Sequence, residues 1–382
     1  MKDLGQKIMI FDGGMGSEIV KSGVNYTIPE DLNITHPELI KSIHRSYKDA
    51  DFITTNSFGL NKFKYKGSYS IALVAQKAIE NARESGKNVF FDIGPTGMLL
   101  KPMGTLSFDD AYNAFRDIVL CTRDNVDGYI IETFSDLYEL KAAVLAVKEN
   151  SEKPLFATMT FDKSGRTLTG TTPEIMVRFL ESAGVDALGV NCSLGPKELK
   201  SVIERILSCT HTPVLIQPNR GIPRLVNGES VYDLTKEEFT EQIEQFAQNG
   251  VSVIGGCCGT TPEFIESISK FKGLSVKKFQ NGHKNAYCSY SRLVEADSQA
   301  TVAELNISED ITADECEDVA YEVLDLEDEG ADAVKLIASR VSPEVIKALI
   351  EKIQEMSNIP LLIDSNDEMI VGVFKRYYNG VC

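Results

Sequence analysis

Short apolar runs rich in Val, Ile and Phe recur through the first part of the chain, and stretches of mixed charge with helical spacing separate them. Runs of this kind suit strands of a parallel sheet that is buried on both faces. We expect eight strands, at Ile8–Gly13, Phe52–Phe58, Val89–Gly94, Gly128–Phe134, Leu155–Phe161, Ala187–Ser193, Val214–Pro218 and Val251–Gly256. Eight strand–helix units in about 270 residues match the size of a (β/α)8 TIM barrel, so the predicted fold class is α/β with this barrel.

A doubly wound open sheet is the structural alternative. The first apolar run leads into a glycine-rich stretch, with glycines at positions 13, 14 and 16. These glycines do not form the G-x-G-x-x-G pattern that binds a dinucleotide at a strand-to-helix turn. The sequence therefore favours the closed barrel.

The pattern changes after Gly273, where the chain becomes polar and weakly periodic. We predict a barrel over residues 1–273, a linker over 274–300 and a partial, acidic β/α domain over 301–382. Its apolar runs resemble the opening strands of a second barrel, and they lie at 302–307, 333–337, 360–363 and 380–382. Half a barrel leaves open sheet edges. We therefore expect either a truncated chain or an appended subdomain that packs on the first barrel or dimerises.

Charge and hydropathy exclude several kinds of partner. A formal net charge of -17 over 382 residues would repel nucleic acid and anionic membranes. No apolar run reaches the roughly 18 residues of a membrane span, and the N-terminus turns polar before a signal-peptide core could form. The prediction is a cytoplasmic protein whose partner is a small molecule or a protein that tolerates its acidic charge.

Much of the negative charge lies in one segment near the C-terminus. Residues 304–330 hold twelve acidic side chains and no Lys or Arg. Thr312 and Glu315 have the spacing of a capping box, which predicts a helix that begins there. The segment is either a solvated helix with an acidic outer face or a docking surface for a basic partner.

The active site of a (β/α)8 barrel lies where the C-terminal ends of its strands converge. The polar and sulfur-bearing residues at these ends are Asp12, Asn56, Asp92, Glu132, Thr160, Asp162, Asn191, Cys192, Gln217, Asn219, Cys257 and Cys258. Only one strand separates the sixth from the eighth, so Cys192 can approach the adjacent pair Cys257 and Cys258. A disulfide within that pair is disfavoured because neighbouring side chains point apart.

Three converging cysteines can hold a metal. Three thiolates around a tetrahedral cation suit zinc, and three protein ligands leave a fourth position for a substrate. The three could also be small buried hydrophobic residues or part of a four-ligand structural site. A zinc ion in such an open site would hold a substrate thiol as its thiolate, which can attack an activated methyl group. The predicted chemistry is alkyl transfer to a thiol.

Seven segments of this chain resemble the homocysteine S-methyltransferase family, and most closely the homocysteine-binding module at the N-terminus of cobalamin-dependent methionine synthases. The segments are FDGGMGSEI (11–19), ITTNSFG (53–59), DIGPTG (92–97), ETFSDLYELKAAVLA (132–146), MTFDKSGRTLTGTTP (159–173), GVNCSLGP (189–196) and GGCCGTTPE (255–263). The combination of GGCCG with an upstream NC is specific to this family. The resemblance covers about 270 of the 382 residues.

The resemblance implies a role for each part of the site. Cys192, Cys257 and Cys258 would be the zinc ligands, and the side-chain oxygen of Asn219 would hold the fourth position until the homocysteine sulfur displaces it. Glu132 would accept the substrate ammonium group. Substrate binding is thus expected from Glu132 and from the loop formed by Asp12, Gly13, Gly14, Met15, Gly16 and Ser17, whose backbone N–H groups would bind the carboxylate. The catalytic residues would be Glu132 and Asn219.

Some of these residues also have plainer interpretations. The glycines could permit a tight turn, and Asp12 could satisfy backbone donors at a strand end. The sequence departs from the family at QPNRG (217–221), where Arg220 replaces the small residue usual in the relatives. Its effect on the mouth of the barrel or on a partner is left open.

The methyl donor is not fixed by the first barrel, because betaine, S-methylmethionine and methylcobalamin all serve related barrels. Residues 301–382 resemble the start of a pterin-binding barrel, with Asp364 and Asn366 resembling residues of its pocket. We therefore favour methylcobalamin on a corrinoid domain or protein elsewhere. The alternatives are a betaine or S-methylmethionine enzyme, a noncatalytic zinc or thiol-binding module, and an enzyme for another small thiol or selenol. A homo-oligomer is also left open.

Overall fold

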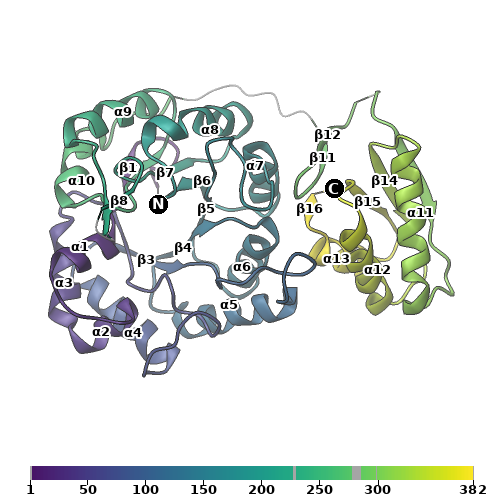
Figure 1. Cartoon of the computed structure of the whole chain (residues 1–382), viewed down its shortest axis with the longest axis horizontal. Helices are drawn as coiled ribbons and strands as arrows, with labels where there is room; N and C mark the ends of the chain where they lie inside the picture. The colour runs from purple at the N-terminus through teal and green to yellow at the C-terminus, as the bar shows by residue number, and fades with distance from the viewer. Residues whose placement is uncertain (1, 227–228, 278–284, 298, 382) are drawn as a thin grey trace.

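The computed structural model describes residues 2–226, 229–277, 285–297 and 299–381. Its largest sheet has eight parallel strands in the order β1-β10-β7-β6-β5-β4-β3-β2 (Figure 1). These strands are β1 (Met9–Ile10), β2 (Phe52–Thr54), β3 (Asn88–Ile93), β4 (Gly128–Phe134), β5 (Leu155–Met159), β6 (Ala187–Asn191), β7 (Val214–Gln217) and β10 (Val253–Ile254). A bridge between Phe11 and Phe52 joins the first strand to the second. The sheet therefore closes, and the predicted (β/α)8 barrel is confirmed.

Helices surround this sheet on the outside (Figure 1). They are α1 (Met15–Lys21), α2 (Leu32–Thr35), α3 (Pro37–Ser46), α4 (Ile71–Arg83), α5 (Phe108–Thr122), α6 (Leu137–Asn150), α7 (Pro173–Ser182), α8 (Pro196–Cys209), α9 (Lys236–Gln248) and α10 (Pro262–Ile268). Local sequence explains several starts. Ser70 and Ser107 accept N–H bonds at the first turns of α4 and α5, and α7, α8 and α10 begin with proline.

One buried side chain from each strand, or from the residue directly after it, fills the interior of the barrel. The eight are Phe11, Phe52, Phe90, Ile130, Phe156, Ala187, Leu215 and Val253. The four phenylalanine rings lie with centroids 4.8–6.0 Å apart, within the range of favourable aromatic packing. The interior is therefore a packed core, and only the mouth above it is open to chemistry.

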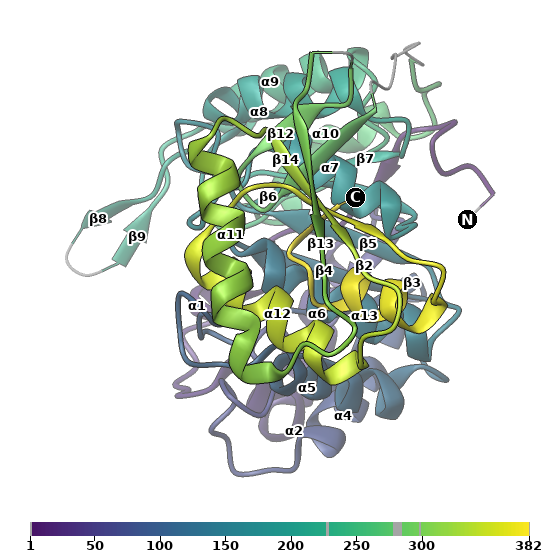
Figure 2. The same ribbon diagram turned by 90° about the vertical axis from the view of Figure 1, so that its right-hand side faces the viewer.

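A hairpin that the sequence pattern did not predict lies between β7 and α9. Its strands are β8 (Arg224–Val226) and β9 (Glu229–Val231), which pair antiparallel. Figure 2 shows this hairpin projecting from the side of the barrel that faces the viewer in Figure 1. Because it follows the C-terminal end of β7, it stands at the mouth.

The C-terminal part contains a three-stranded parallel sheet of β13 (Val302–Asn306), β14 (Ala333–Ile337) and β15 (Leu361–Asp364). Its helices are α11 (Cys316–Asp328), α12 (Pro343–Met356) and α13 (Glu368–Tyr377), which pack with the sheet around a second hydrophobic core. The predicted capping box of Thr312 and Glu315 is present at the 3-10 turn before α11. The domain limits stay a prediction.

The expectation of a fourth strand in that parallel sheet is wrong. β16 (Gly380–Val381) pairs antiparallel with β11 (Ala286–Ser289), which also pairs with β12 (Leu293–Glu295). The predicted linker therefore contains two strands, β11 and β12. Residues 278–284 and 298 of that linker, and Cys382 of the predicted last strand, lie outside the described residues. The hydroxyl of the buried Tyr378 donates to the Cys288 carbonyl at 3.1 Å. This contact brings the chain end beside β11 rather than beside β15.

Side chains of α12 and α13 bind the outer face of α5 and α6. The Lys347 ammonium lies 2.6 Å from the Asp109 carboxylate, and the Tyr138 hydroxyl donates to the Tyr377 carbonyl at 2.8 Å. The Arg376 guanidinium lies 4.3 Å from the centroid of the Tyr112 ring. The C-terminal part thus packs on the barrel, one of the expected arrangements. No helix within the described residues is long and apolar enough to cross a membrane.

A buried carboxyl group on α6 makes the barrel sensitive to pH. Glu139 is 4% exposed and accepts the Thr96 N–H at 2.7 Å. Burial raises its pKa to about 7, from 4.5, although the hydrogen bonds from Thr96 oppose the shift. The folded protein therefore favours the neutral form, and it loses stability as the pH rises from the unfolded pKa towards 7.

Glu139→Gln is expected to remove this loss, because the amide oxygen can still accept the Thr96 N–H. Between pH 5 and pH 8 the free energy of unfolding of the variant should gain about 2.5 kcal/mol on that of the wild type, because the pKa of Glu139 is about 7 in the folded chain and 4.5 in the unfolded chain. Urea unfolding at the two pH values measures the difference. The exposed Glu152→Gln should show no such gain, and an equal pH response of wild type and Glu139→Gln would contradict the prediction.

Candidate metal centre and its pocket

The structure brings the three predicted cysteines together at the mouth of the barrel. Cys192 follows β6, and Cys257 and Cys258 follow β10, with only β7 between these strands. The Cys258 sulfur lies 4.0 Å from that of Cys192 and 3.9 Å from that of Cys257. Within the described chain, these are the residues of the one His, Cys, Asp or Glu group that could hold a metal, and their sulfurs all lie within 4.8 Å of one another.

The spacing fits zinc. Zn–S bonds of about 2.3 Å in a tetrahedral arrangement place two sulfur ligands about 3.8 Å apart. The two separations of 3.9 and 4.0 Å are close to this value. The cysteine trio, as we call Cys192, Cys257 and Cys258, is therefore able to bind zinc with little movement.

The backbone holds the trio by ladder-like hydrogen bonds. The N–H of Cys192 donates to the Gln217 carbonyl at 2.9 Å, and the N–H of Cys257 donates to the Pro218 carbonyl at 2.9 Å. Cys192 and Ser193 have φ angles of 58° and 60°. This left-handed conformation is costly for residues other than glycine, and such strain is typical of functional sites.

The pKa values of the three thiols shift in different directions. Hydrogen bonds from Cys192 and then from Cys257 lower the pKa of Cys258 to about 3. Hydrogen bonds with Cys192 and then with Cys258, followed by burial, raise the pKa of Cys257 well above its usual range. The geometry therefore favours the thiolate at Cys258 over the other two sulfurs, and a bound cation would displace the remaining protons of the trio.

Asn219 lies beside the trio. It is buried, and its side-chain oxygen accepts the N–H of Cys258 at 3.2 Å. To reach a metal in the trio, this oxygen would have to exchange its bond to the backbone. The structure therefore places Asn219 beside the trio and gives its oxygen a protein partner, and its role as a fourth ligand stays a prediction.

Three carboxyl groups, Asp12, Asp92 and Glu132, lie close enough to interact electrostatically in the mouth. Burial raises the pKa of Asp12 and of Asp92 well above the ordinary range, and the charge of Glu132 adds to both shifts. Burial, followed by the charge of Cys258, raises the pKa of Glu132 to about 7. Asp92 Oδ1 has no hydrogen-bond partner among the described residues. This concentration of acceptors suits a cationic group of a ligand.

Asp12 also has a structural task. Its carboxylate accepts the Thr54 N–H at 2.9 Å and the Thr54 hydroxyl at 3.1 Å. The plainer interpretation, in which Asp12 satisfies donors at a strand end, is therefore correct in part. A ligand could use only the acceptor positions that Thr54 leaves.

The glycine loop after β1 lies against the loop that carries Cys257. A Cβ atom at Gly13 would approach the Thr260 carbonyl oxygen to 2.6 Å, and one at Gly14 would approach the Cys257 carbonyl oxygen to 2.7 Å. The glycines are therefore needed for close approach. The N–H groups of Asp12, Gly14 and Ser17 already donate to protein carbonyls. The loop's other donors are the N–H groups of Gly13, Met15 and Gly16.

Arg220 contacts residues on both sides of the base of the β8–β9 hairpin. Its guanidinium lies 4.7 Å from the centroid of the Phe264 ring, and its Nε donates to the Leu234 carbonyl at 2.8 Å. Tyr232, directly after β9, lies close enough to Cys258 for its hydroxyl to help lower the pKa of that thiol, after the larger effects of Cys192 and Cys257. Sequence reasoning missed Tyr232 because it follows no barrel strand.

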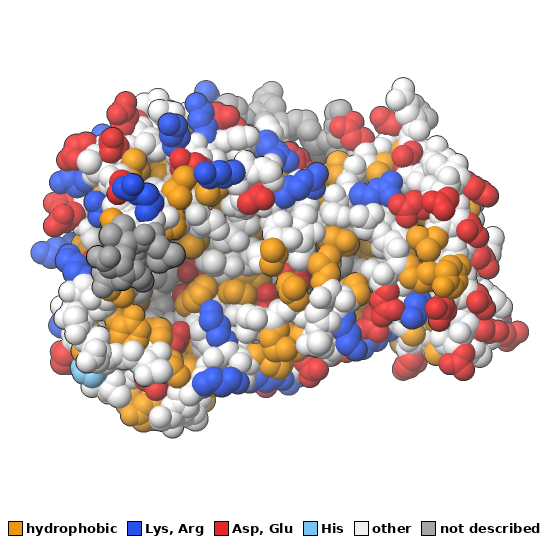
Figure 3. All heavy atoms as spheres, viewed as in Figure 1, with side chains coloured by type: hydrophobic (Ala, Val, Ile, Leu, Met, Phe, Trp, Pro, Cys, Tyr) orange, Lys and Arg blue, Asp and Glu red, His pale blue; other side chains and the backbone are white. Residues whose placement is uncertain are grey.

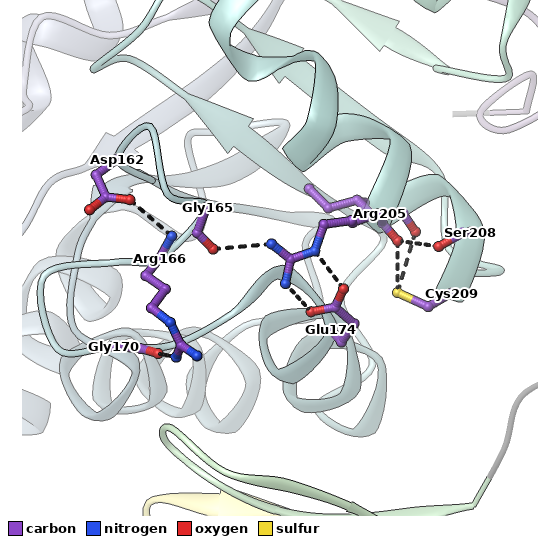
Figure 4. A network of polar contacts seen from close by, with 9 residues as sticks. Asp162, Gly165, Arg166, Gly170, Glu174, Arg205, Ser208 and Cys209 are labelled. Atoms are coloured by element: carbon purple, nitrogen blue, oxygen red, sulfur yellow. Dashed lines mark hydrogen bonds and ion pairs between the residues drawn. The ribbon is translucent and has the colours of Figure 1, made fainter.

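An ion pair fixes the loop between β5 and α7, which forms another part of the mouth. Arg205 of α8 contacts the Glu174 carboxylate with Nε at 2.7 Å and with one Nη at 2.6 Å (Figure 4). Its other Nη donates to the Gly165 carbonyl at 3.4 Å. Within the loop, Asp162 accepts the N–H of Arg166 at 3.1 Å. These bonds tie the loop to α7 and α8.

Comparisons with known proteins identify relatives of this chain. Residues 9–271 match the family model described as homocysteine S-methyltransferase. The methionine synthase of Mycobacterium tuberculosis is 27% identical over 427 aligned positions, covering 99% of this chain and 35% of the relative. That of Mycobacterium leprae is 30% identical, covering 70% of this chain and 24% of the relative. The chain thus spans about a third or less of these curated relatives.

A solved structure shows the same fold. The metallated form of the homocysteine methyltransferase MmuM from Escherichia coli aligns with a TM-score of 0.60 and 21% identity. The alignment covers 69% of this chain and 96% of that one. The match is therefore to a nearly complete barrel.

Proposed function

Because the chain belongs to the homocysteine S-methyltransferase family of enzymes, we propose that it binds zinc, activates homocysteine as a thiolate and methylates it to methionine. The observation that carries the proposal is the trio, with sulfur separations of 3.9 and 4.0 Å beside a group of buried carboxyls. Zinc held by Cys192, Cys257 and Cys258 would favour the thiolate form of a substrate thiol at neutral pH.

The chain's own residues would bind and orient the amino acid. Glu132 accepts the ammonium group, and the carboxyl oxygens of Asp12 and Asp92 lie near it as further acceptors. The N–H groups of Gly13, Met15 and Gly16 bind the carboxylate near the start of α1. These contacts fix the α-carbon end of the substrate, and zinc would hold the sulfur at the other end. The sulfur would then point at the incoming methyl group, which lowers the entropic cost of the reaction.

The reaction is a methyl displacement. A new bond forms between the substrate sulfur and the methyl carbon, while the bond from that carbon to the donor breaks and leaves its electron pair on the donor. No proton has to move in this step, because the thiol has already lost it. The site needs only to admit the donor and keep the sulfur exposed to it.

We propose a methylcorrinoid, carried on another domain or protein, as the donor. Exposed apolar side chains lie on the segments that follow β3, β5 and β7 at the mouth; they are Met98, Leu99, Met103, Leu168, Ile222 and Val231. Figure 3 shows hydrophobic side chains gathered across the middle of this face. Such a patch favours a bulky, partly apolar partner over a small polar donor such as betaine.

We also propose the division into a homocysteine barrel (1–273), a connecting segment (274–300) and a partial pterin-barrel-like domain (301–382). The separate hydrophobic core around β13–β15 supports it. Similarity to the M. tuberculosis relative extends over this part, since it covers 99% of the chain. A cytoplasmic location stays a prediction.

The test is methyl transfer by the full chain loaded with zinc. With L-homocysteine, we expect methionine to form from methylcobalamin, and far less from betaine or S-methylmethionine, as measured by mass spectrometry. Turnover from betaine but not from methylcobalamin would overturn the donor assignment. If the chain binds zinc but calorimetry shows no heat of binding for L-homocysteine, the result would instead support a noncatalytic zinc-binding module.

A further inference from the structure

Asn191, the last residue of β6, forms an interior bridge between strands. Its side chain is completely buried. The amide oxygen accepts the N–H of Thr133 and the hydroxyl of Thr158, each at 2.8 Å. The amide nitrogen donates to the Thr133 hydroxyl at 2.7 Å and to the Glu132 carboxylate at 3.3 Å. One side chain thus joins β6 to β5 and β4.

The bonds to β4 reach an irregular place in that strand. In the pairing of β4 with β5, Ile131 lies opposite Ala157, and the next pair is Phe134 opposite Met159. Two residues of β4 thus stand against one residue of β5 between these pairs, which is a bulge. Thr133, in this bulge, has a φ angle of 65°. A bulge changes the direction in which a side chain points, and a left-handed Thr persists only where its surroundings hold it.

Asn191 supplies that hold. It bonds to both the N–H and the hydroxyl of Thr133, which fixes the bulge, and its third partner on β4 is the Glu132 carboxylate itself. The next residue in the chain, Cys192, belongs to the trio. The position of the carboxylate and the position of the sulfur are therefore coupled through adjacent residues, Asn191 at the end of β6 and Cys192 directly after it.

We propose that Asn191 is a positioning residue that holds Glu132 at the distance from the trio at which one homocysteine can reach both. The inference rests on the proposed function, because it takes Glu132 as the acceptor of the substrate ammonium group. Asn191 itself contacts neither the substrate nor the metal. It acts by fixing the carboxylate, so its loss affects recognition of the amino group and leaves the three sulfur ligands in place.

The test compares two thiols, L-homocysteine and 4-mercaptobutyrate, which has the same thiol and carboxylate but no amino group. Calorimetry on the full, zinc-loaded chain gives both affinities for wild type and Asn191→Ala. We expect the variant to bind homocysteine at least tenfold more weakly, to bind 4-mercaptobutyrate within about threefold of wild type, and to keep its zinc. Asn191→Ser, which leaves room for a bridging water, replaces the alanine variant if that variant does not fold.

Thr158→Val is the matched control. It removes the one hydrogen bond of Asn191 that does not lead to β4, and it changes the shape of the core little. Both affinities should stay within about threefold of wild type. Provided that the wild type binds homocysteine more tightly than 4-mercaptobutyrate, two results would overturn the inference. One is an Asn191 variant that loses affinity for both thiols equally, and the other is a variant that loses affinity for neither. A wild-type chain that binds neither thiol would overturn the proposed function, and this inference with it.

Discussion

Cys192→Ala is expected to lose stoichiometric zinc and to lower the rate of methionine formation by about a thousandfold or more. Cys192 directly follows β6, whereas the other two sulfurs come from adjacent residues after β10. Without Cys192, two neighbouring cysteines remain, and they cannot surround a tetrahedral cation. Metal analysis after dialysis and methyl-transfer assays measure the two losses.

Cys209→Ala is the control for this variant. Cys209 is partly buried at the end of α8, where its thiol donates to the Arg205 carbonyl at 3.1 Å. It belongs to the same barrel but lies outside the trio, so zinc content and activity should both stay at the wild-type level. Cys192→Ala with one zinc per chain and full activity would remove the proposed mechanism.

The barrel and its trio could be predicted because both follow from simple periodicities. Runs of Val, Ile and Phe mark strands that are buried on both faces, and the mouth of a barrel collects whatever follows them. Cys192, Cys257 and Cys258 are adjacent to such runs. Their convergence depends only on strand order, and strand order in a (β/α)8 barrel follows chain order.

Contacts that depend on register or on an insertion were not predictable. Asn191 is visible as a strand-end residue, but its bonds to β4 require the bulge at Thr133, which no local pattern marks. Tyr232 reaches Cys258 only because a hairpin follows β7. The two-residue strand β16 was misplaced for a similar reason, since its partner β11 lies in a stretch too polar to be recognised as a strand.

Glu132→Gln is expected to lower kcat/KM for L-homocysteine by about a hundredfold, through the loss of a charge-assisted contact to the ammonium group. The amide keeps the size of the side chain, and its nitrogen replaces a carboxylate oxygen near the substrate. Zinc content should stay at one per chain, because the trio is intact. Affinity for 4-mercaptobutyrate should change little. The exposed Glu152→Gln should leave the kinetics unaltered.

Combining Glu132→Gln with Asn191→Ala separates positioning from general damage. Asn191 donates to the Glu132 carboxylate at 3.3 Å. If it acts only through this carboxylate, then removing Asn191 should change the affinity for homocysteine little in a chain that already lacks the carboxylate. The double variant should therefore bind homocysteine within about threefold of Glu132→Gln alone, since residues that act as one unit are not additive. Two independent effects would multiply to a much larger loss, and that result would place Asn191 outside the recognition of the amino group.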